Sequence, residues 1–201
     1  MSEKSDTSLD MPPDPTQSEE MTAFYAALGH ALTQWAHVEY YLANVYAAVL
    51  DRDYKIAGAA FYAVENFRSK LQMVDSVVRS AVANPDLLAD WTGSQTTLGL
   101  QDRIKTASRV RNNLAHFTVL AEPHKKAGKR WHLRPNIYDP MTPRMDPYNP
   151  QGGYYARDLE KIPALFGPLA MALMNYSNKL VGAKLVAGFD AQVPRQTKRI
   201  G

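Results

Sequence analysis

The sequence predicts a mainly α-helical protein, an up-down bundle of four to five helices with a β-hairpin and loop inserted before the last helix. Apolar residues recur every three or four positions in three long stretches of the chain. Short polar connections separate these stretches. A segment rich in Pro, Gly, Tyr and Lys, at about 117–153, then interrupts the helical pattern before a final amphipathic stretch.

The composition restricts the class of protein. A chain of 201 residues is long enough for one domain with a full core. It has no cysteine, which excludes disulfides, Cys-ligated metals and thiol nucleophiles and fits a reducing cytoplasm. We expect no secretory leader, because Met1 to Asp10 are polar and acidic and have no basic or apolar leader region. We expect no membrane span, because no apolar run reaches about eighteen residues. The sequence therefore predicts a soluble, cytoplasmic protein.

Charge is unevenly distributed, although the net charge of +3 is too small to indicate a nucleic-acid ligand by itself. Residues 1–17 are acidic and contain three closely spaced prolines, so we expect a disordered leader there. The helical domain is expected at 18–186, followed by a basic tail at 187–201. A second basic stretch, His124 to Arg134, contains no acid.

The first helix is expected to begin after Ser18, a suitable N-cap followed by two glutamates. Its apolar stripe contains Met21, Phe24, Tyr25, Leu28, Leu32, Trp35, Leu42, Val45, Tyr46 and Val49. Glu39 stands on this stripe where an apolar residue is expected.

The second helix is predicted to follow Asp51-Arg52-Asp53 and to continue to about Val82. Its core-facing residues are Ile56, Ala60, Val64, Phe67, Leu71, Val74, Val78 and Val82. Asn84 and Pro85 form the start signal of a third helix, whose first half is weakened by two glycines. The clearer second half places Leu100, Ile104, Ala107, Arg111, Leu114 and Thr118 on one face.

Residues 117–121 and 131–138 flank a basic turn and predict a β-hairpin. A loop at 139–153 should follow. The last helix is expected to start near Asp158 and to run past Leu180, with its start delayed or kinked by Pro163 and Pro168.

Glu39 and Arg111 are charged residues on stripes that should face the core. An unpaired buried charge costs several kcal/mol, so each is expected to have a partner. They pair with each other in one hypothesis. In another, the stripe faces solvent for one turn.

The segment Arg111-Asn-Asn-Leu-Ala-His116 combines groups suited to phosphodiester chemistry. His116 can move the proton of a ribose 2′-hydroxyl or of the leaving oxygen, and Arg111 can stabilise charge on the phosphate. Asn112 lies one helical turn before His116 and shares its face. No metal is needed for this chemistry. Because chance gives roughly one such Arg–His spacing in a chain of this composition, the context of the helix carries the argument.

The segment resembles the HEPN family (higher eukaryotes and prokaryotes nucleotide-binding domains), helical bundles with an Arg-x(4–6)-His motif at the end of a core helix. Arg111, Asn112 and His116 match that motif residue by residue, and Glu39 looks like the polar position that many members carry on the first helix. The architecture matches over about residues 18 to 185. The hairpin before the last helix is an addition to the family pattern.

The resemblance implies a homodimer in which two Arg–His pairs line one cleft. Active members are metal-independent endoribonucleases that leave 2′,3′-cyclic phosphate and 5′-hydroxyl ends, whereas others are inactive modules that bind RNA or nucleotides. Some act as toxins beside a separate antitoxin protein. For this chain it implies Arg111, Asn112 and His116 as catalytic residues, with Glu39 orienting Arg111, and no cofactor.

Two other hypotheses remain. The basic hairpin provides a second candidate RNA-binding surface, made of Lys125, Lys126, Lys129, Arg130 and Trp131. Alternatively, the chain is a non-catalytic dimeric interaction protein in which Arg111 and Glu39 form a structural pair. A metal site at His30 and His37 is not favoured, because no Asp or Cys ligand lies at a suitable spacing.

Overall fold

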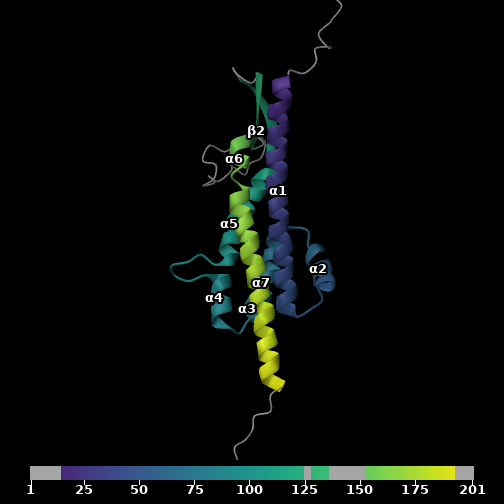
Figure 1. The fold of residues 1–201 in the computed structure, drawn as a ribbon, viewed down its shortest axis with the longest axis vertical. Coiled ribbons are helices and arrows are strands. Elements are labelled where there is room, and N and C mark those ends of the chain that lie inside the picture. The colour runs from purple at the N-terminus through teal and green to yellow at the C-terminus, as the bar shows by residue number, and fades with distance from the viewer. Residues whose placement is uncertain (1–14, 125–127, 136–152, 193–201) are drawn as a thin grey trace, which may run out of the picture. The chain divides into compact units, whose positions relative to one another are not determined.

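The computed structural model describes residues 15–124, 128–135 and 153–192. Their helices and strands, in chain order, are α1 (Pro15–Leu50), α2 (Tyr54–Tyr62), α3 (Phe67–Ala81), α4 (Pro85–Thr92), α5 (Leu100–His116), β1 (Thr118–His124), β2 (Gly128–Arg134), β3 (Tyr154–Tyr155), α6 (Ala156–Leu159) and α7 (Pro163–Gln192) (Figure 1). The prediction of a mainly helical bundle with a β insertion before the last helix is confirmed.

The chain divides into two compact units. The sheet unit comprises Met1–Leu32 and Asn112–Pro163, and the bundle unit comprises Thr33–Arg111 and Ala164–Gly201. Helices α1 and α5 contribute residues to both units.

Aromatic side chains organise the core of the bundle unit. The Trp35 ring of α1 makes edge contacts with Phe67 of α3 and Phe166 of α7, at centroid distances of 4.8 and 5.2 Å. Trp91 of α4 stacks on Tyr176 of α7 at 5.8 Å. The buried apolar residues that surround these contacts include Val38, Leu42, Val45, Phe61, Leu71, Val74, Val78, Ile104, Ala107, Val110, Leu169, Leu173 and Leu180. Helices that are far apart in the sequence thus share one apolar interior.

The predicted second helix is wrong in one respect, since it is two helices. Asn66 has an extended backbone, and its side chain accepts a hydrogen bond from the Ser69 amide at 2.8 Å, which caps the start of α3. Asp53 caps α2 in the same way through Lys55, also at 2.8 Å. The apolar spacing of Val64 and Phe67 continues across the break and concealed it.

The predicted third helix is also divided. Asn84 caps α4 and Pro85 occupies its first turn, as expected. Gly93 then adopts a φ of 84°, and residues Gly93 and Leu98 form an isolated β-bridge. A Cβ at Gly93 would lie 2.5 Å from the backbone nitrogen of Gly99, so only glycine fits this turn. The chain re-enters a helix at Leu100.

In the sheet unit, β1 and β2 form the predicted antiparallel hairpin, with Glu122 opposite Arg130 and Leu120 opposite His132. The strand β3 was not predicted; it pairs antiparallel with β2, which gives the sheet order β1-β2-β3. Lys125 and Lys126 lie outside the described residues, and so does the loop predicted at 139–153 apart from Gly153.

The outer helices differ from their predicted limits. Helix α1 begins at Pro15, three residues before Ser18, and α7 continues to Gln192, into the segment expected to be a tail. Residues 1–14 and 193–201 lie outside the described part of the chain. Pro163 begins α7, and Pro168 lies inside it.

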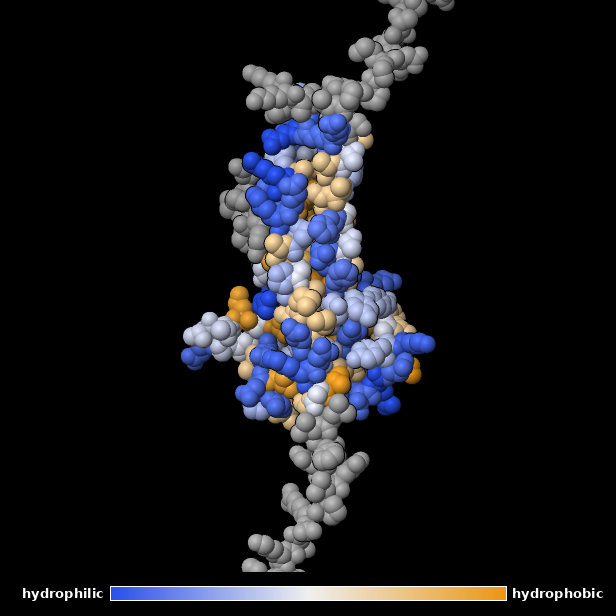
Figure 2. Space-filling view, in the orientation of Figure 1, coloured by the Kyte–Doolittle hydropathy of each residue, from blue (hydrophilic) through white to orange (hydrophobic). Residues whose placement is uncertain are grey.

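The surface is mixed in character. The face seen in Figure 2 is largely hydrophilic, with hydrophobic residues in separate patches. Within the described ranges, no helix is long and apolar enough to cross a membrane.

Candidate functional site

The Arg111-to-His116 segment forms the last turns of α5, and the helix continues without a break to His116. Arg111 is half-buried, whereas Asn112 and His116 are exposed. Asn112 and His116 are one helical turn apart, so their side chains leave the helix on the same side. Two polar groups are therefore accessible to a ligand directly after a half-buried guanidinium group.

The core-facing stripe of α5 passes through Val110 instead of Arg111. Val110 is only 1% exposed, in line with the buried residues Ile104, Ala107 and Leu114. Thr118, which was expected on the same helical face, belongs to β1. The placement of Arg111 in the centre of the stripe was therefore wrong, and Arg111 flanks it.

Asn113 connects the end of α5 to the sheet. The Asn113 side-chain amide donates a hydrogen bond to the Tyr154 hydroxyl at 3.1 Å. The Asn113 backbone carbonyl accepts one from the Phe117 backbone amide at 2.9 Å. The rings of Phe117 and Tyr154 lie 6.0 Å apart. Because Tyr154 is 1% exposed, this contact fixes the last turn of α5 against a buried side chain. Sequence reasoning missed this role of Asn113.

Glu39 is paired with a lysine that the sequence analysis did not single out. The Glu39 side chain, 19% exposed, has Oε1 3.5 Å from Nζ of Lys70 on α3, whose side chain is 10% exposed. The same ammonium group lies 5.3 Å from the centre of the Phe61 ring and 5.0 Å from that of Tyr62. Glu39 thus takes part in a largely buried ion pair among aromatic rings.

The apolar stripe of α1 is continuous beside this pair, because the fully buried Val38 fills the position between Trp35 and Leu42. Burial, followed by the charge of Glu39 and the nearby Tyr40, raises the pKa of Tyr62 above its ordinary value. That Glu39 also orients Arg111 remains a prediction.

The described members of the predicted RNA-binding set are Lys129, Arg130 and Trp131, which follow one another on β2 and alternate between its two faces. Lys129 is exposed, and the neighbouring Trp131 is half-buried with its ring 6.3 Å from that of Tyr25 on α1. The Arg130 guanidinium, which points to the other face, lies 4.2 Å from the centre of the Tyr155 ring. Arg130 therefore faces away from Lys129 and Trp131 on β2.

A polar cluster around Arg130 was also missed. The Tyr155 hydroxyl donates a hydrogen bond to Oε1 of Glu122 at 2.9 Å, and Oε2 of Glu122 lies 3.9 Å from Nη2 of Arg134. The His132 and Tyr155 rings are 5.3 Å apart. Alternation along β2 places residues 130, 132 and 134 together, a signal that the sequence offered once the strand was assigned.

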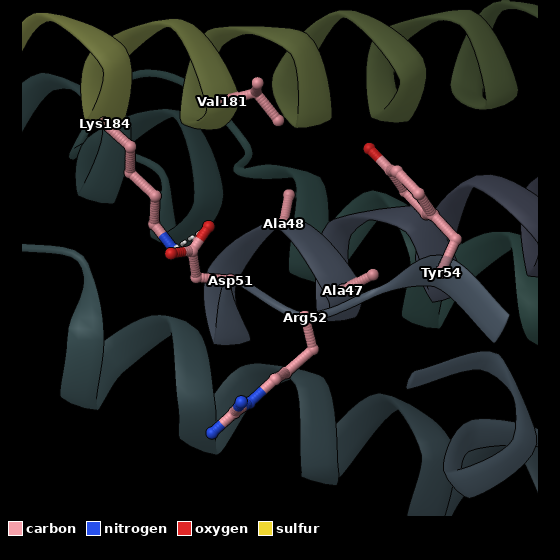
Figure 3. A pocket seen from close by; sticks show the side chains of 7 residues that line it. All are labelled: Ala47, Ala48, Asp51, Arg52, Tyr54, Val181 and Lys184. Carbon is pink, nitrogen blue, oxygen red and sulfur yellow. Dashed lines mark ion pairs between the residues drawn. The ribbon is translucent and has the colours of Figure 1, made fainter. Parts of the chain in front are cut away.

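A shallow depression of about 320 Å³ lies where α1 ends, lined by Ala47, Ala48, Asp51, Arg52, Tyr54, Val181 and Lys184 (Figure 3). Lys184 donates a hydrogen bond to the Val49 carbonyl at 2.9 Å and lies 3.9 Å from a carboxylate oxygen of Asp51. The lysine therefore caps one of the last carbonyls of α1, that of Val49. The depression contains none of the predicted site residues.

His30 and His37 are both exposed on α1. The residues that the structure describes contain no group of three or more His, Cys, Asp or Glu side chains placed to hold a metal ion.

No protein-family model, curated protein or solved structure matches this chain. The case for a function therefore depends on the residues and contacts given above.

Proposed function

We propose that this protein is a HEPN-like, metal-independent endoribonuclease whose reaction is carried out by Arg111, Asn112 and His116. The observation that carries the proposal is the exposure of Asn112 and His116 at the last turn of α5, directly after the half-buried Arg111. Asn113 supports the same turn through its hydrogen bond to Tyr154.

In the proposed reaction, an imidazole accepts the proton of a ribose 2′-hydroxyl, and the 2′-oxygen forms a bond to the adjacent phosphorus. The bond from phosphorus to the 5′-oxygen breaks, and that oxygen leaves with a proton. The products are a 2′,3′-cyclic phosphate and a 5′-hydroxyl end. Arg111 stabilises the negative charge on the phosphoryl oxygens, and the Asn112 amide donates a further hydrogen bond.

A homodimer would supply a second His116, so that one imidazole accepts a proton while the other donates one. The proposal extends to a toxin or defence role with a separate antitoxin protein as partner. The competing function is RNA binding without cleavage, which is favoured by the basic residues of β2, since Lys129 is exposed and Arg130 is half-buried on the opposite face.

The test compares His116→Ala with His37→Ala, because both remove one exposed histidine from a helix. Each variant and the wild-type chain are incubated with end-labelled single-stranded RNA in the presence of EDTA, and the product ends are identified. We expect cleavage by the wild type and by His37→Ala, and at least about a 10³-fold loss in His116→Ala.

Circular-dichroism melting must show that His116→Ala retains the wild-type melting temperature. The endoribonuclease proposal fails if His116→Ala cuts RNA as well as His37→Ala does. It also fails if the purified wild type binds RNA and never cuts it, a result that supports the binding function.

A further inference from the structure

The proposed reaction does not use the polar face of the sheet. We call it the Arg130 face, defined by Arg130, His132 and Arg134 of β2 with Glu122 of β1 and Tyr155 of β3. The register places Glu122 opposite Arg130 and Tyr155 opposite His132, so alternation brings all five side chains to one side. On the other side, Leu133 and Tyr154 are each 1% exposed and belong to the core.

The Arg130 guanidinium is oriented by an aromatic ring. Its central carbon lies 4.2 Å from the centre of the Tyr155 ring, within the range of a cation–π contact. Tyr155 is itself fixed by the hydrogen bond from its hydroxyl to Glu122, at 2.9 Å. A guanidinium group held over a ring keeps its N–H donors at the edge, where they can bind an oxyanion. This geometry restricts the orientation of Arg130 before any ligand arrives.

The charges of this face do not cancel. Glu122 accepts a hydrogen bond from the Tyr155 hydroxyl and forms an ion pair with Arg134 at 3.9 Å. Two guanidinium groups therefore stand beside one carboxylate, which leaves an excess of one positive charge. The Arg134 side chain is 53% exposed, so it can turn toward a ligand.

His132 lies in the middle of the face and is only 3% exposed. Its Nδ1 atom is buried and has no hydrogen-bond partner among the described residues. Burial lowers the pKa of His132, and the charges of Arg134 and Arg130 act in the same direction, whereas the Glu122 charge and the Arg130 backbone oppose them. The imidazole is therefore neutral at neutral pH, and the two arginines set the charge of the face.

We infer that the Arg130 face binds the phosphates of single-stranded RNA, with Arg130 on one phosphate and Arg134 on another. This inference rests on the proposed function, since RNA is the ligand that a ribonuclease has to hold. The α-carbons of residues four apart on a strand are roughly 13 Å apart, and the Arg134 side chain, 53% exposed, can turn from Glu122 toward a second phosphate, so an RNA chain can engage both arginines. Trp131 is not part of this surface.

The test uses the full chain carrying His116→Ala, so that the RNA stays intact. Binding of a fluorescein-labelled oligouridylate of about 20 nucleotides is followed by fluorescence anisotropy at several salt concentrations. Arg130→Ala should raise the Kd about tenfold and reduce the slope of log K against log salt by about one. The matched control is Arg68→Ala, which removes an exposed arginine from α3 and should change the Kd less than about twofold.

A second pair of variants tests the aromatic support without changing the charge. Tyr155→Phe keeps the ring under Arg130 but loses the hydrogen bond to Glu122, so it should raise the Kd less than Tyr155→Leu does. Tyr155→Leu removes the ring and should raise the Kd about threefold. Melting curves of all variants confirm that the chain is folded.

Equal losses in Arg130→Ala and Arg68→Ala overturn the inference, because RNA is then attracted by overall charge alone. Displacement of the RNA by polyglutamate as readily as by unlabelled RNA overturns it too, and so does the absence of binding at low salt. The two proposals fail separately. Cleavage that depends on His116 with binding indifferent to Arg130 refutes only the Arg130 face, whereas binding that depends on Arg130 without His116-dependent cleavage refutes only the ribonuclease.

Discussion

Two pairs of residues adjacent in the sequence, Val38-Glu39 in α1 and Val110-Arg111 in α5, each combine a valine with a charged residue but have different surroundings. In each pair the valine is buried and carries the apolar stripe, while the charged residue lies beside it. Glu39 is paired with Lys70 among aromatic rings. Arg111 is followed by Asn112 and His116, which are exposed. A charge beside an apolar stripe is therefore found in both surroundings, and what differs between the two pairs is the exposure of the residues that follow the charge.

The largest effect expected from this comparison is on catalysis at the end of α5. Arg111→Lys keeps the positive charge and loses the planar group with several N–H donors, so transition-state stabilisation of the phosphate is lost. We expect kcat for RNA cleavage to fall by about 10²-fold or more, with little change in melting temperature. Single-turnover cleavage kinetics measure this, with Arg103→Lys, an exposed position on the same helix, as the control. A variant that cleaves RNA at the wild-type rate contradicts the assigned role of Arg111.

For the Glu39–Lys70 pair of α1 and α3, we expect an effect on stability rather than on catalysis. Glu39→Gln leaves the Lys70 ammonium group largely buried without its counter-charge and should lower the free energy of unfolding by about 2 to 3 kcal/mol. Urea denaturation measures the loss, and Glu65→Gln, at an exposed position between α2 and α3, is the matched control.

The double variant Glu39→Leu with Lys70→Met should recover most of that stability, because it leaves no buried charge unpaired. A neutral effect of Glu39→Gln would mean that the pair contributes nothing to the fold. The kcat of Glu39→Gln, measured under conditions in which this variant is fully folded, tests whether Glu39 also orients Arg111.

A smaller effect is expected where the end of α5 is attached to the sheet. Asn113→Ala removes the hydrogen bond to Tyr154 and should lower the free energy of unfolding by about 1 kcal/mol. It should also reduce cleavage less than Arg111→Lys does, because Asn113 positions the turn without touching the phosphate. Tyr154→Phe removes the same hydrogen bond from the other side. The two variants should therefore agree, and clearly unequal effects on cleavage would show that this hydrogen bond is not what positions His116.

The parts of the fold that were predictable from sequence are those fixed by local chemistry. Asn84 and Pro85 start α4 because a cap and a fixed φ act within one turn. The hairpin followed from the two strand-like runs around a basic turn. The break between α2 and α3 was missed because Val64 and Phe67 continue the helical spacing across it. At two residues, β3 is too short for an alternating pattern to be recognised.

The candidate site likewise has features that the sequence could predict and features that only the folded structure shows. Arg111, Asn112 and His116 lie within six residues of one helix, so their grouping could be predicted without tertiary structure. Lys70 is 31 residues from Glu39 in the sequence, and Tyr155 is 33 residues from Glu122, so neither contact leaves a local signal. The distinction between Val38 and Glu39, or between Val110 and Arg111, also requires the packed structure, because a spacing of three or four fits either neighbour.

The smallest expected effect concerns the pH dependence of stability at His132, the counterpart of the exposed His116. Because burial lowers the pKa of His132 in the folded chain, the unfolded chain, with an ordinary value of about 6.5, binds a proton more readily. The stability contributed by the neutral imidazole is complete above about pH 6.5 and is lost as the pH falls through the lower pKa of the folded chain. His132→Gln should therefore show a smaller loss of stability between pH 7.5 and pH 5 than the wild type, measured by urea denaturation.

His37→Gln controls for removal of an exposed histidine and should leave the slope of stability against pH unchanged. A variant of Glu122, one of the charged groups that act on the pKa of His132, provides a further test. Glu122→Gln removes the one nearby charge that favours protonation, so it should steepen the pH dependence of the chain that retains His132. If the free energies of unfolding of His132→Gln and the wild type change in parallel with pH, protonation of this imidazole is not linked to folding. His132 and His116 then differ in their exposure and not in a coupling of charge to stability.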